Sequence, residues 1–131
     1  MKLLTSAQRA KLLDNGRRQA AVKGTSAEID FYPVVKLFDP CGAATWLLTE
    51  IDPDDVTAAW GICDLGMGFP EFGTVSLTEL AQYRGRLGLG IERDLYFKAR
   101  GPISVYIEAA NKAGRIVATI DVQEDAKAGA P

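Results

Sequence analysis

Five acidic residues occur where a folded sheet could bring them together, at the ends of expected strands or in the adjoining loops. They are Glu50, Asp64, Glu71, Glu92 and Asp94. Carboxylates that converge in twos or threes bind Mg²⁺ or Mn²⁺, which can activate water for phosphodiester hydrolysis. An acid beside an arginine, as Glu92 and Asp94 are beside Arg93, is more often half of an ion pair. A metal-dependent phosphodiesterase or nuclease is therefore the alternative hypothesis, and Mg²⁺ or Mn²⁺ is expected as a cofactor only in that case.

A glycine-rich loop over residues 64–73 is the second candidate surface. Two aromatic rings, Phe69 and Phe72, flank Pro70-Glu71 in a stretch whose glycines and proline disfavour regular structure. Exposed rings of this kind mark contact surfaces. We expect an unidentified protein partner to bind this acidic, aromatic-flanked loop and the charged strand ends near it. The candidate binding residues are Asp64, Phe69, Glu71, Phe72, Glu92, Arg93 and Asp94.

The absence of histidine from the chain removes the commonest catalytic and metal-binding arrangements. Ser-His-Asp triads, Cys-His pairs and HExxH zinc sites all need it. Cys41 and Cys63, which are 22 residues apart, match neither a redox pair nor a zinc-ligand spacing, so we expect two reduced thiols. The glycine-containing stretches lack the order of nucleotide-binding motifs. These observations favour a non-enzymatic protein.

Charge is distributed unevenly along the chain. Residues 1–26 carry six basic side chains and one acidic, whereas residues 27–79 carry one basic and ten acidic, a net charge of −9. An acidic middle repels a phosphate backbone, which argues against direct binding of nucleic acid. Mimicry of DNA against restriction enzymes is a weaker alternative, because a net charge of −2 is far from the charge density of a duplex.

Length and composition predict one globular domain. The chain has 131 residues, of which 47% are hydrophobic and 24% charged. This size allows a core that needs no disulfide or metal. No apolar run is long enough to span a membrane, and the run at the N-terminus is too short for a signal peptide, so we expect a cytoplasmic protein. We predict a single α+β domain over residues 1–122 and a disordered tail over residues 123–131.

Helices are expected near residues 6–21, 77–84 and 102–113. Thr5 with Gln8, and Ser76 with Glu79, have the spacing of capping boxes at the first two helix starts. Pro102 is expected at the first helical position of the third. The pair Asn15-Gly16 is typical of a helix C-terminus, which allows an early end within the first helix.

Strands are expected near residues 34–38, 44–51 and 57–63. The turn Asp52-Pro53-Asp54-Asp55 predicts an antiparallel hairpin between the second and third. Further extended pieces are expected at residues 73–75, 89–97 and 116–122, the last as an edge strand. Because helices and strands do not alternate regularly, we predict a mainly antiparallel sheet of four to five strands packed with three helices.

Several motifs in a fixed order carry a family resemblance. They are Val34-Val35-Lys36-Leu37-Phe38, Thr45-Trp46-Leu47-Leu48-Thr49-Glu50, Gly61-Ile62-Cys63-Asp64-Leu65-Gly66-Met67-Gly68-Phe69-Pro70-Glu71-Phe72-Gly73, Ser76-Leu77-Thr78-Glu79-Leu80 and Ile91-Glu92-Arg93-Asp94-Leu95-Tyr96-Phe97. With the segment from Leu3 to Gly16, this string resembles an uncharacterised bacterial family catalogued as domain of unknown function 2958. The resemblance covers about residues 1–114.

The resemblance implies a home on plasmids, integrative elements and phages, beside antirestriction, methyltransferase or helicase-like modules. It implies no activity. It does single out matching residues as candidates: Glu50, Glu71, Ser76, Glu79, Glu92, Arg93 and Asp94. This chain departs from the pattern at Thr74-Val75, where relatives often have an aromatic residue after the glycine.

Overall fold

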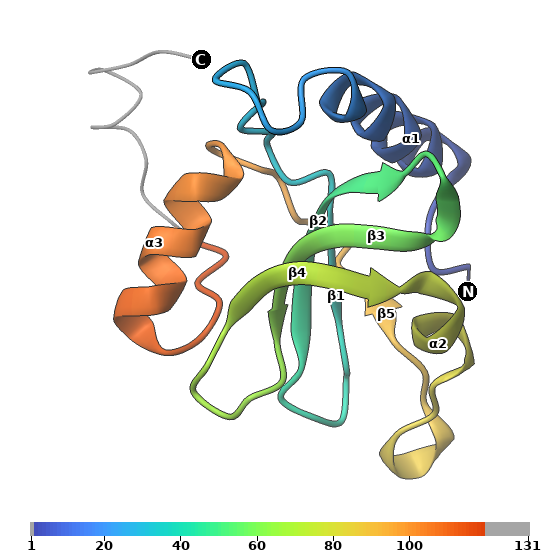
Figure 1. Ribbon diagram of the computed structural model, residues 1–131. Helices are drawn as coiled ribbons and strands as arrows, with labels where there is room; N and C mark the ends of the chain where they lie inside the picture. Colours follow the sequence, from blue (N-terminus) through green and yellow to red (C-terminus); the bar gives the residue numbers. More distant parts are fainter. Residues whose placement is uncertain (1, 120–131) are drawn as a thin grey trace.

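One antiparallel sheet organises the computed structural model, which describes residues 2–119 (Figure 1). The strand order is β4-β3-β2-β1-β5, and each neighbouring pair is antiparallel. The elements in chain order are α1 (Ser6–Ala20), β1 (Val35–Phe38), β2 (Thr45–Asp52), β3 (Asp55–Asp64), β4 (Glu71–Ser76), α2 (Leu77–Gln82), a 3₁₀ turn (Arg86–Gly88), β5 (Glu92–Arg93) and α3 (Ile103–Ala113). The predicted α+β class, with an antiparallel sheet and three α-helices, is confirmed.

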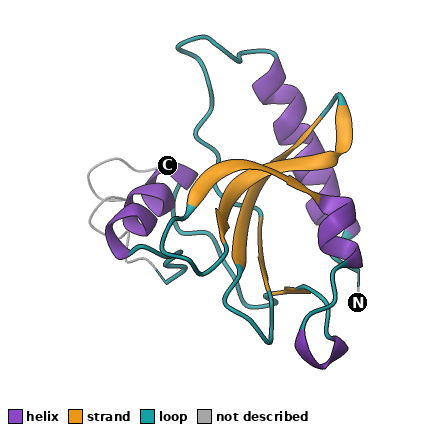
Figure 2. Cartoon of the chain, turned by 60° about the horizontal axis from the view of Figure 1, so that its bottom comes forward, coloured by secondary structure: helices purple, strands orange, loops and turns teal. Residues whose placement is uncertain are grey.

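The sheet separates two hydrophobic clusters, because alternate residues of each strand point to opposite faces. Leu12 of α1 and Leu80 of α2 pack with Leu48 on one face. On the other face, Tyr106 of α3 packs with Leu47. Figures 1 and 2 show α1 and α3 on opposite sides of the sheet. None of the helices described within residues 2–119 has the length and apolar character that a membrane crossing would need.

The β2–β3 hairpin forms as its turn chemistry predicts. The Asp54 N–H donates to the Asp52 side chain over 2.8 Å, and the two strands pair from Thr45 opposite Asp64 to Asp52 opposite Asp55. The register shifts between Leu48 and Glu50, so that Thr49 forms an irregularity in β2. Bulges of this kind bend a strand and increase its twist.

The first helix begins as predicted and does not end at Asn15-Gly16. The Thr5 and Gln8 capping box is complete, with both bonds at 3.0 Å. Asn15 and Gly16 are buried in mid-helix, and the Asn15 amide donates to the Thr49 carbonyl over 2.9 Å. A Cβ on Gly16 would lie only 1.7 Å from the Ile51 carbonyl oxygen. The pair that resembles a helix stop is thus the place where α1 packs directly on β2.

The other differences from expectation lie in the second half of the chain. The extended piece predicted at residues 89–97 is a strand only at Glu92–Arg93, and residues 116–119 are not a strand. Residues 120–122 of that expected edge strand, and the expected tail at 123–131, lie outside the described residues. Pro102 is the N-cap of α3 rather than its first residue. A free backbone N–H at the start of α3 is capped by a residue remote in sequence: the Ser104 N–H donates to the Asp30 carboxylate over 3.1 Å.

Gly16→Ala is expected to lower the free energy of unfolding by about 1–3 kcal/mol, because the new methyl group collides with the backbone of β2. On an exposed helix the same change would stabilise by about 1 kcal/mol. The sign of the change in the free energy of unfolding, measured in urea, therefore shows whether Gly16 is packed against β2 or lies on an exposed helix surface.

Gly73→Ala, measured in dilute solution so that association between copies does not contribute, is the matched control, since a Cβ on Gly73 would meet nothing within 4 Å in its own chain. It is expected to leave the free energy of unfolding unchanged or to raise it by up to about 1 kcal/mol. A Gly16→Ala protein as stable as this control would contradict direct packing of α1 on β2.

Candidate functional site

Asp64 holds the base of the 64–73 segment. One carboxylate oxygen accepts from the Gly66 N–H over 2.8 Å, and the other accepts from the Ile116 N–H over 2.9 Å. The side chain is only 4% exposed. Asp64, predicted as a binding or metal-ligating residue, therefore has both oxygens engaged with backbone. It joins the end of β3 to the chain that follows α3.

Two glycines shape the rest of the segment. Gly66 and Gly68 have φ angles of 81° and 85°, a region that residues with a Cβ rarely adopt. A Cβ on Gly66 would also lie 2.4 Å from that of Ala43, so the β1–β2 connection packs against the segment. On the other side, Gly114 at the end of α3 approaches the Gly68 carbonyl. The segment therefore packs against neighbouring parts of the fold at Gly66 and Gly68.

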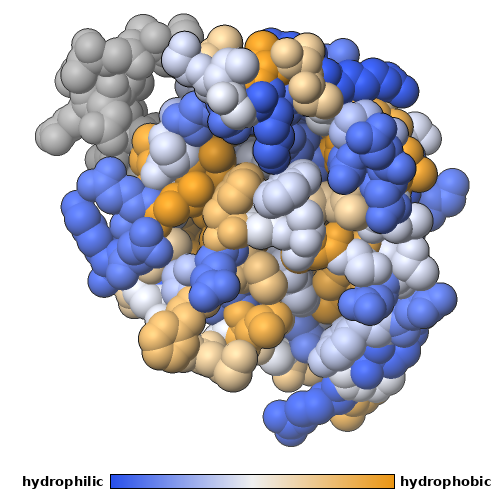
Figure 3. All heavy atoms as spheres, viewed as in Figure 1, coloured by the Kyte–Doolittle hydropathy of each residue, from blue (hydrophilic) through white to orange (hydrophobic). Residues whose placement is uncertain are grey.

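The segment presents apolar side chains to solvent. Phe69 is 79% exposed, Met67 is 69% exposed, and Leu65 and Phe72 are also exposed. Apolar side chains gather at the lower left of the space-filling view, over the β3–β4 connection (Figure 3). The sequence predicted this role for Phe69 and Phe72 but missed Leu65 and Met67. The alternation of glycine with Leu65, Met67 and Phe69 was the available signal.

Phe72 also belongs to an aromatic stack on the face of the sheet. Its ring lies 6.0 Å from that of Trp60, with an angle of 23° between the planes. The Lys23 ammonium lies 4.2 Å from the Trp60 ring centroid, in cation–π geometry. Trp60 is thus fixed by Lys23 and stacked on Phe72. This arrangement holds the exposed Phe72 ring in place.

A shallow hollow of about 330 Å³ lies between β4 and α3, beside the same ring. Apart from Asn111 and Glu71, its lining is apolar: Ile62, Pro70, Phe72, Ile107 and Ala110. Glu71 is exposed and is the one charged side chain among the lining residues. The hollow therefore suits an apolar group that carries a positive charge at one end.

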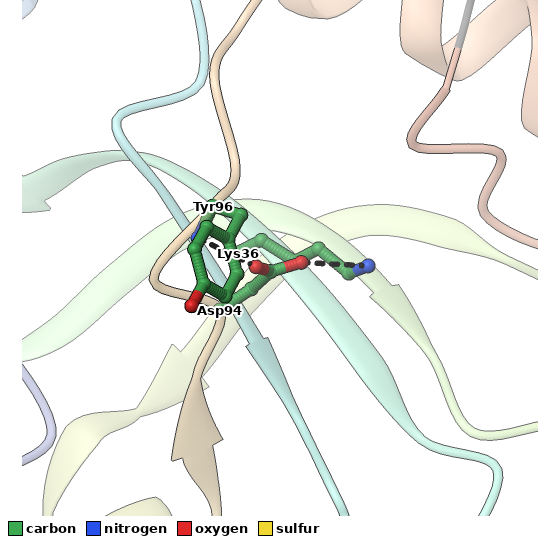
Figure 4. Close-up of polar contacts among 3 residues, drawn as sticks. All are labelled: Lys36, Asp94 and Tyr96. Atoms are coloured by element: carbon green, nitrogen blue, oxygen red, sulfur yellow. Dashed lines mark hydrogen bonds and ion pairs between the residues drawn. The ribbon is translucent and has the colours of Figure 1, made fainter.

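The predicted candidates at residues 92–94 lie at the other edge of the sheet. β5 pairs with β1, whereas β4 pairs with β3, so the two groups of candidates are not brought together. The Arg93 guanidinium donates to the Lys2 carbonyl over 2.6 Å, and Asp94 lies 3.3 Å from the Lys36 ammonium. Figure 4 shows that ion pair and the bond from the Tyr96 N–H to Asp94. Here Arg93 and Asp94 fasten β5 and the N-terminus to the sheet.

Glu50 is the remaining predicted ligand, and it is buried, with 7% of its surface exposed. Burial raises the pKa of its carboxyl above the ordinary value, while Lys23 and the hydroxyl of Thr49 act in the opposite direction. No three His, Cys, Asp or Glu side chains within residues 2–119 are placed to hold a metal ion together. The predicted carboxylates therefore serve separate roles.

A larger groove of about 860 Å³ was not predicted from the sequence. It is lined by the first turns of α1 and α2 and by residues 88–92. Its charged side chains are Lys2, Arg9, Arg84 and Glu92, so it favours an anion over a cation. The Arg84 guanidinium already donates to the carbonyls of Ala81 and Tyr83.

The family model described as protein of unknown function (DUF2958) matches residues 3–117. The chain belongs to the DUF2958 family. The expected family membership is thereby confirmed, and the match includes the 64–73 segment, β4 and α3. Neither curated proteins nor solved structures show a significant match to this DUF2958 chain.

Glu50→Gln is expected to stabilise the protein at neutral pH. The folded-state pKa of Glu50 is raised, so the native state holds its proton more tightly than the unfolded chain does. The native state therefore loses stability as pH rises from the ordinary pKa of 4.5 through the folded-state value. The amide variant lacks this loss, so its advantage over the wild type should disappear at acidic pH.

Urea unfolding of both proteins from pH 4 to pH 8 measures the effect. Glu108→Gln, an exposed change on α3, should differ from the wild type by no more than about 0.5 kcal/mol throughout. A Glu50→Gln protein less stable than the wild type at pH 7 would mean that attraction to Lys23 outweighs the cost of burial.

Proposed function

We propose that this DUF2958 chain is a cytoplasmic accessory protein of plasmids or other mobile elements, and that it binds a partner protein through the 64–73 segment. One observation carries the proposal: apolar side chains are exposed on a segment whose base is anchored by Asp64 and whose turns at Gly66 and Gly68 have positive φ angles. A surface loop with no partner has no physical need for this combination. Contiguous exposed apolar side chains mark binding sites.

The rigidity of the segment matters for affinity. Binding by a flexible loop loses conformational entropy, at about 0.5–1.5 kcal/mol for each immobilised side chain. Here the backbone is already ordered and Phe72 is already stacked on Trp60. The cost of immobilising Phe72 is thereby reduced, and burial of Phe69 and Met67 against a partner adds apolar contact. An ordered aromatic anchor is typical of an interface hot spot.

The chemistry of the segment also describes the partner. Phe69, the most exposed apolar side chain of the segment, would fit an apolar pocket on the partner. Glu71 would pair with a basic side chain of the partner beside that pocket. A phosphate backbone would meet Glu71 as a like charge, which disfavours nucleic acid at this surface. We therefore expect a protein surface with an apolar centre and a basic margin.

Phe69→Ser is expected to weaken partner binding about thirtyfold or more and to leave stability nearly unchanged. The ring is 79% exposed, so its loss should change the free energy of unfolding by no more than about 0.5 kcal/mol. A hot-spot ring contributes about 2 kcal/mol or more, equivalent to about a thirtyfold loss of affinity. Immobilised wild type and variant would be used to capture proteins from a lysate of the source cell, and the captured protein would be purified for calorimetry.

Tyr96→Ser is the matched control, because Tyr96 is 94% exposed but lies beyond the opposite edge of the sheet. It should bind the purified partner as the wild type does. Equal affinities for the Phe69 and Tyr96 variants would contradict docking through the 64–73 segment.

Thermal melts with Mn²⁺ test the competing metal-dependent hydrolase. On the present proposal neither the wild type nor Glu71→Ala should gain thermal stability from Mn²⁺, and the melting temperatures of the two proteins should agree closely without it. A bound metal would raise the melting temperature in proportion to its occupancy. A wild-type shift with Mn²⁺ that vanishes in Glu71→Ala would favour the hydrolase over the binding module.

A further inference from the structure

β4 is an edge strand whose outer side is unprotected. Within residues 2–119 it pairs with β3 and with no other strand. Every second residue of such a strand directs its N–H and C=O groups outward, where another strand can pair with them. β4 contains no lysine or proline, and its one charged residue, Glu71, is its first.

The opposite edge of the sheet is built differently. β5 is only two residues long, and both Glu92 and Arg93 are charged. Short, charged edges are a usual means of preventing contact between sheets. Within residues 2–119, one edge of the sheet is therefore protected, and the six residues of β4 have no strand paired to their outer side.

The sequence of β4 is compatible with pairing to a second copy of itself. In an antiparallel pair, facing residues share a face of the sheet, whereas sequence neighbours lie on opposite faces. A two-fold axis that relates two identical antiparallel strands must therefore pass midway between the two copies of one residue, so that this residue faces its own copy. With the axis at Gly73, Phe72 faces Thr74, Glu71 faces Val75 and no like charges oppose each other.

The neighbouring registers are less favourable. An axis at Phe72 would bring in Pro70, which has no N–H to donate. An axis at Thr74 would set Phe72 against Ser76, the N-cap of α2, in place of a pair between an aromatic and a β-branched side chain. The Gly73 register keeps that pair twice, once on each side of the axis.

Gly73 itself has no evident role within one copy. Its φ angle is not positive, and a Cβ there would meet nothing within 4 Å. Glycine inside a strand weakens it, and often marks a place where another backbone approaches closely. A second chain at the axis would supply such a backbone.

We propose that two copies of this chain pair antiparallel along β4 about a two-fold axis at Gly73, which joins two sheets into one. The inference stands independently of the proposed docking function. In the pair, residues 65–70 of the two 64–73 segments lie at opposite ends of the joined strands. A partner with two binding sites would then be held by both segments, with a gain in avidity.

Opposite charges at the axis test the proposal. At about 100 µM, sedimentation of the wild type should give a mass twice the 14.1 kDa of the chain. Gly73→Asp and Gly73→Lys should each give 14.1 kDa, because each places like charges face to face. An equal mixture of the two variants should restore the doubled mass.

Val56→Asp and Val56→Lys add the same charges at an exposed site on β3 that lies before the residues paired with β4. These variants should give the same doubled mass as the wild type. A monomeric wild type would overturn the proposal. So would a dimer that survives both Gly73 variants, or one that the mixture does not restore.

Cysteine cross-linking identifies the register even if the charged variants fold poorly. Facing residues in an antiparallel pair are about 4.5–5.5 Å apart at Cα, within reach of a disulfide. Gly73→Cys should therefore form a link from residue 73 to residue 73, identified by peptide mass spectrometry. Thr74→Cys is the control, because its two copies would be about 8 Å apart. A link in Thr74→Cys and none in Gly73→Cys would overturn the Gly73 register. If β4 instead pairs with a strand of another protein, neither the 73–73 nor the 74–74 disulfide would form, and that result would also overturn the proposal.

Discussion

The carboxylate of Asp64 connects the 64–73 segment to the chain that follows α3. It is buried at the end of β3 and accepts one backbone N–H from the turn into β4 and one from the chain after α3. A buried carboxylate is stable only when such donors replace its water, so neither contact can be lost without a large cost. The same interaction orders the 64–73 segment and holds Ile116 against the α3 face of the sheet. The 64–73 segment and one side of the core therefore both depend on a single side chain.

Local chemistry made much of the fold predictable. The Thr5–Gln8 capping box and the turn after Asp52 act over two or three residues, so the sequence pattern is sufficient to place them. The helix near residues 6–21 was predicted, but the packing role of Gly16 was not, because its requirement comes from the Ile51 carbonyl, 35 residues away in the chain. The sequence pattern could not distinguish a glycine that ends a helix from one that lets a strand approach. The same holds for β5, which exists as a strand through its pairing with β1.

The candidate site was predicted less well, because acidic residues that are close in sequence are dispersed in the fold. Of the acids in the acidic middle segment, Glu50 and Asp64 are buried and point to separate neighbours, whereas Asp54 lies at the exposed β2–β3 turn. Glu71 alone accompanies the apolar side chains. The net charge of −9 over residues 27–79 therefore does not create one acidic face. The exposed surface of the 64–73 segment is therefore mainly apolar, with the one charge of Glu71 beside it.

The open strand edge and the apolar segment adjoin each other, and this adjacency has a physical consequence. Each feature alone is an aggregation hazard, because unpaired edges and exposed rings both promote unspecific association. Two devices restrict that hazard here. The bent, glycine-shaped backbone before β4 keeps Phe69 from extending the strand, and α2 begins directly after Ser76 and ends the edge there. An edge bounded on both sides can accept a strand of limited length in few registers. Such a surface favours a specific partner over open-ended stacking of sheets.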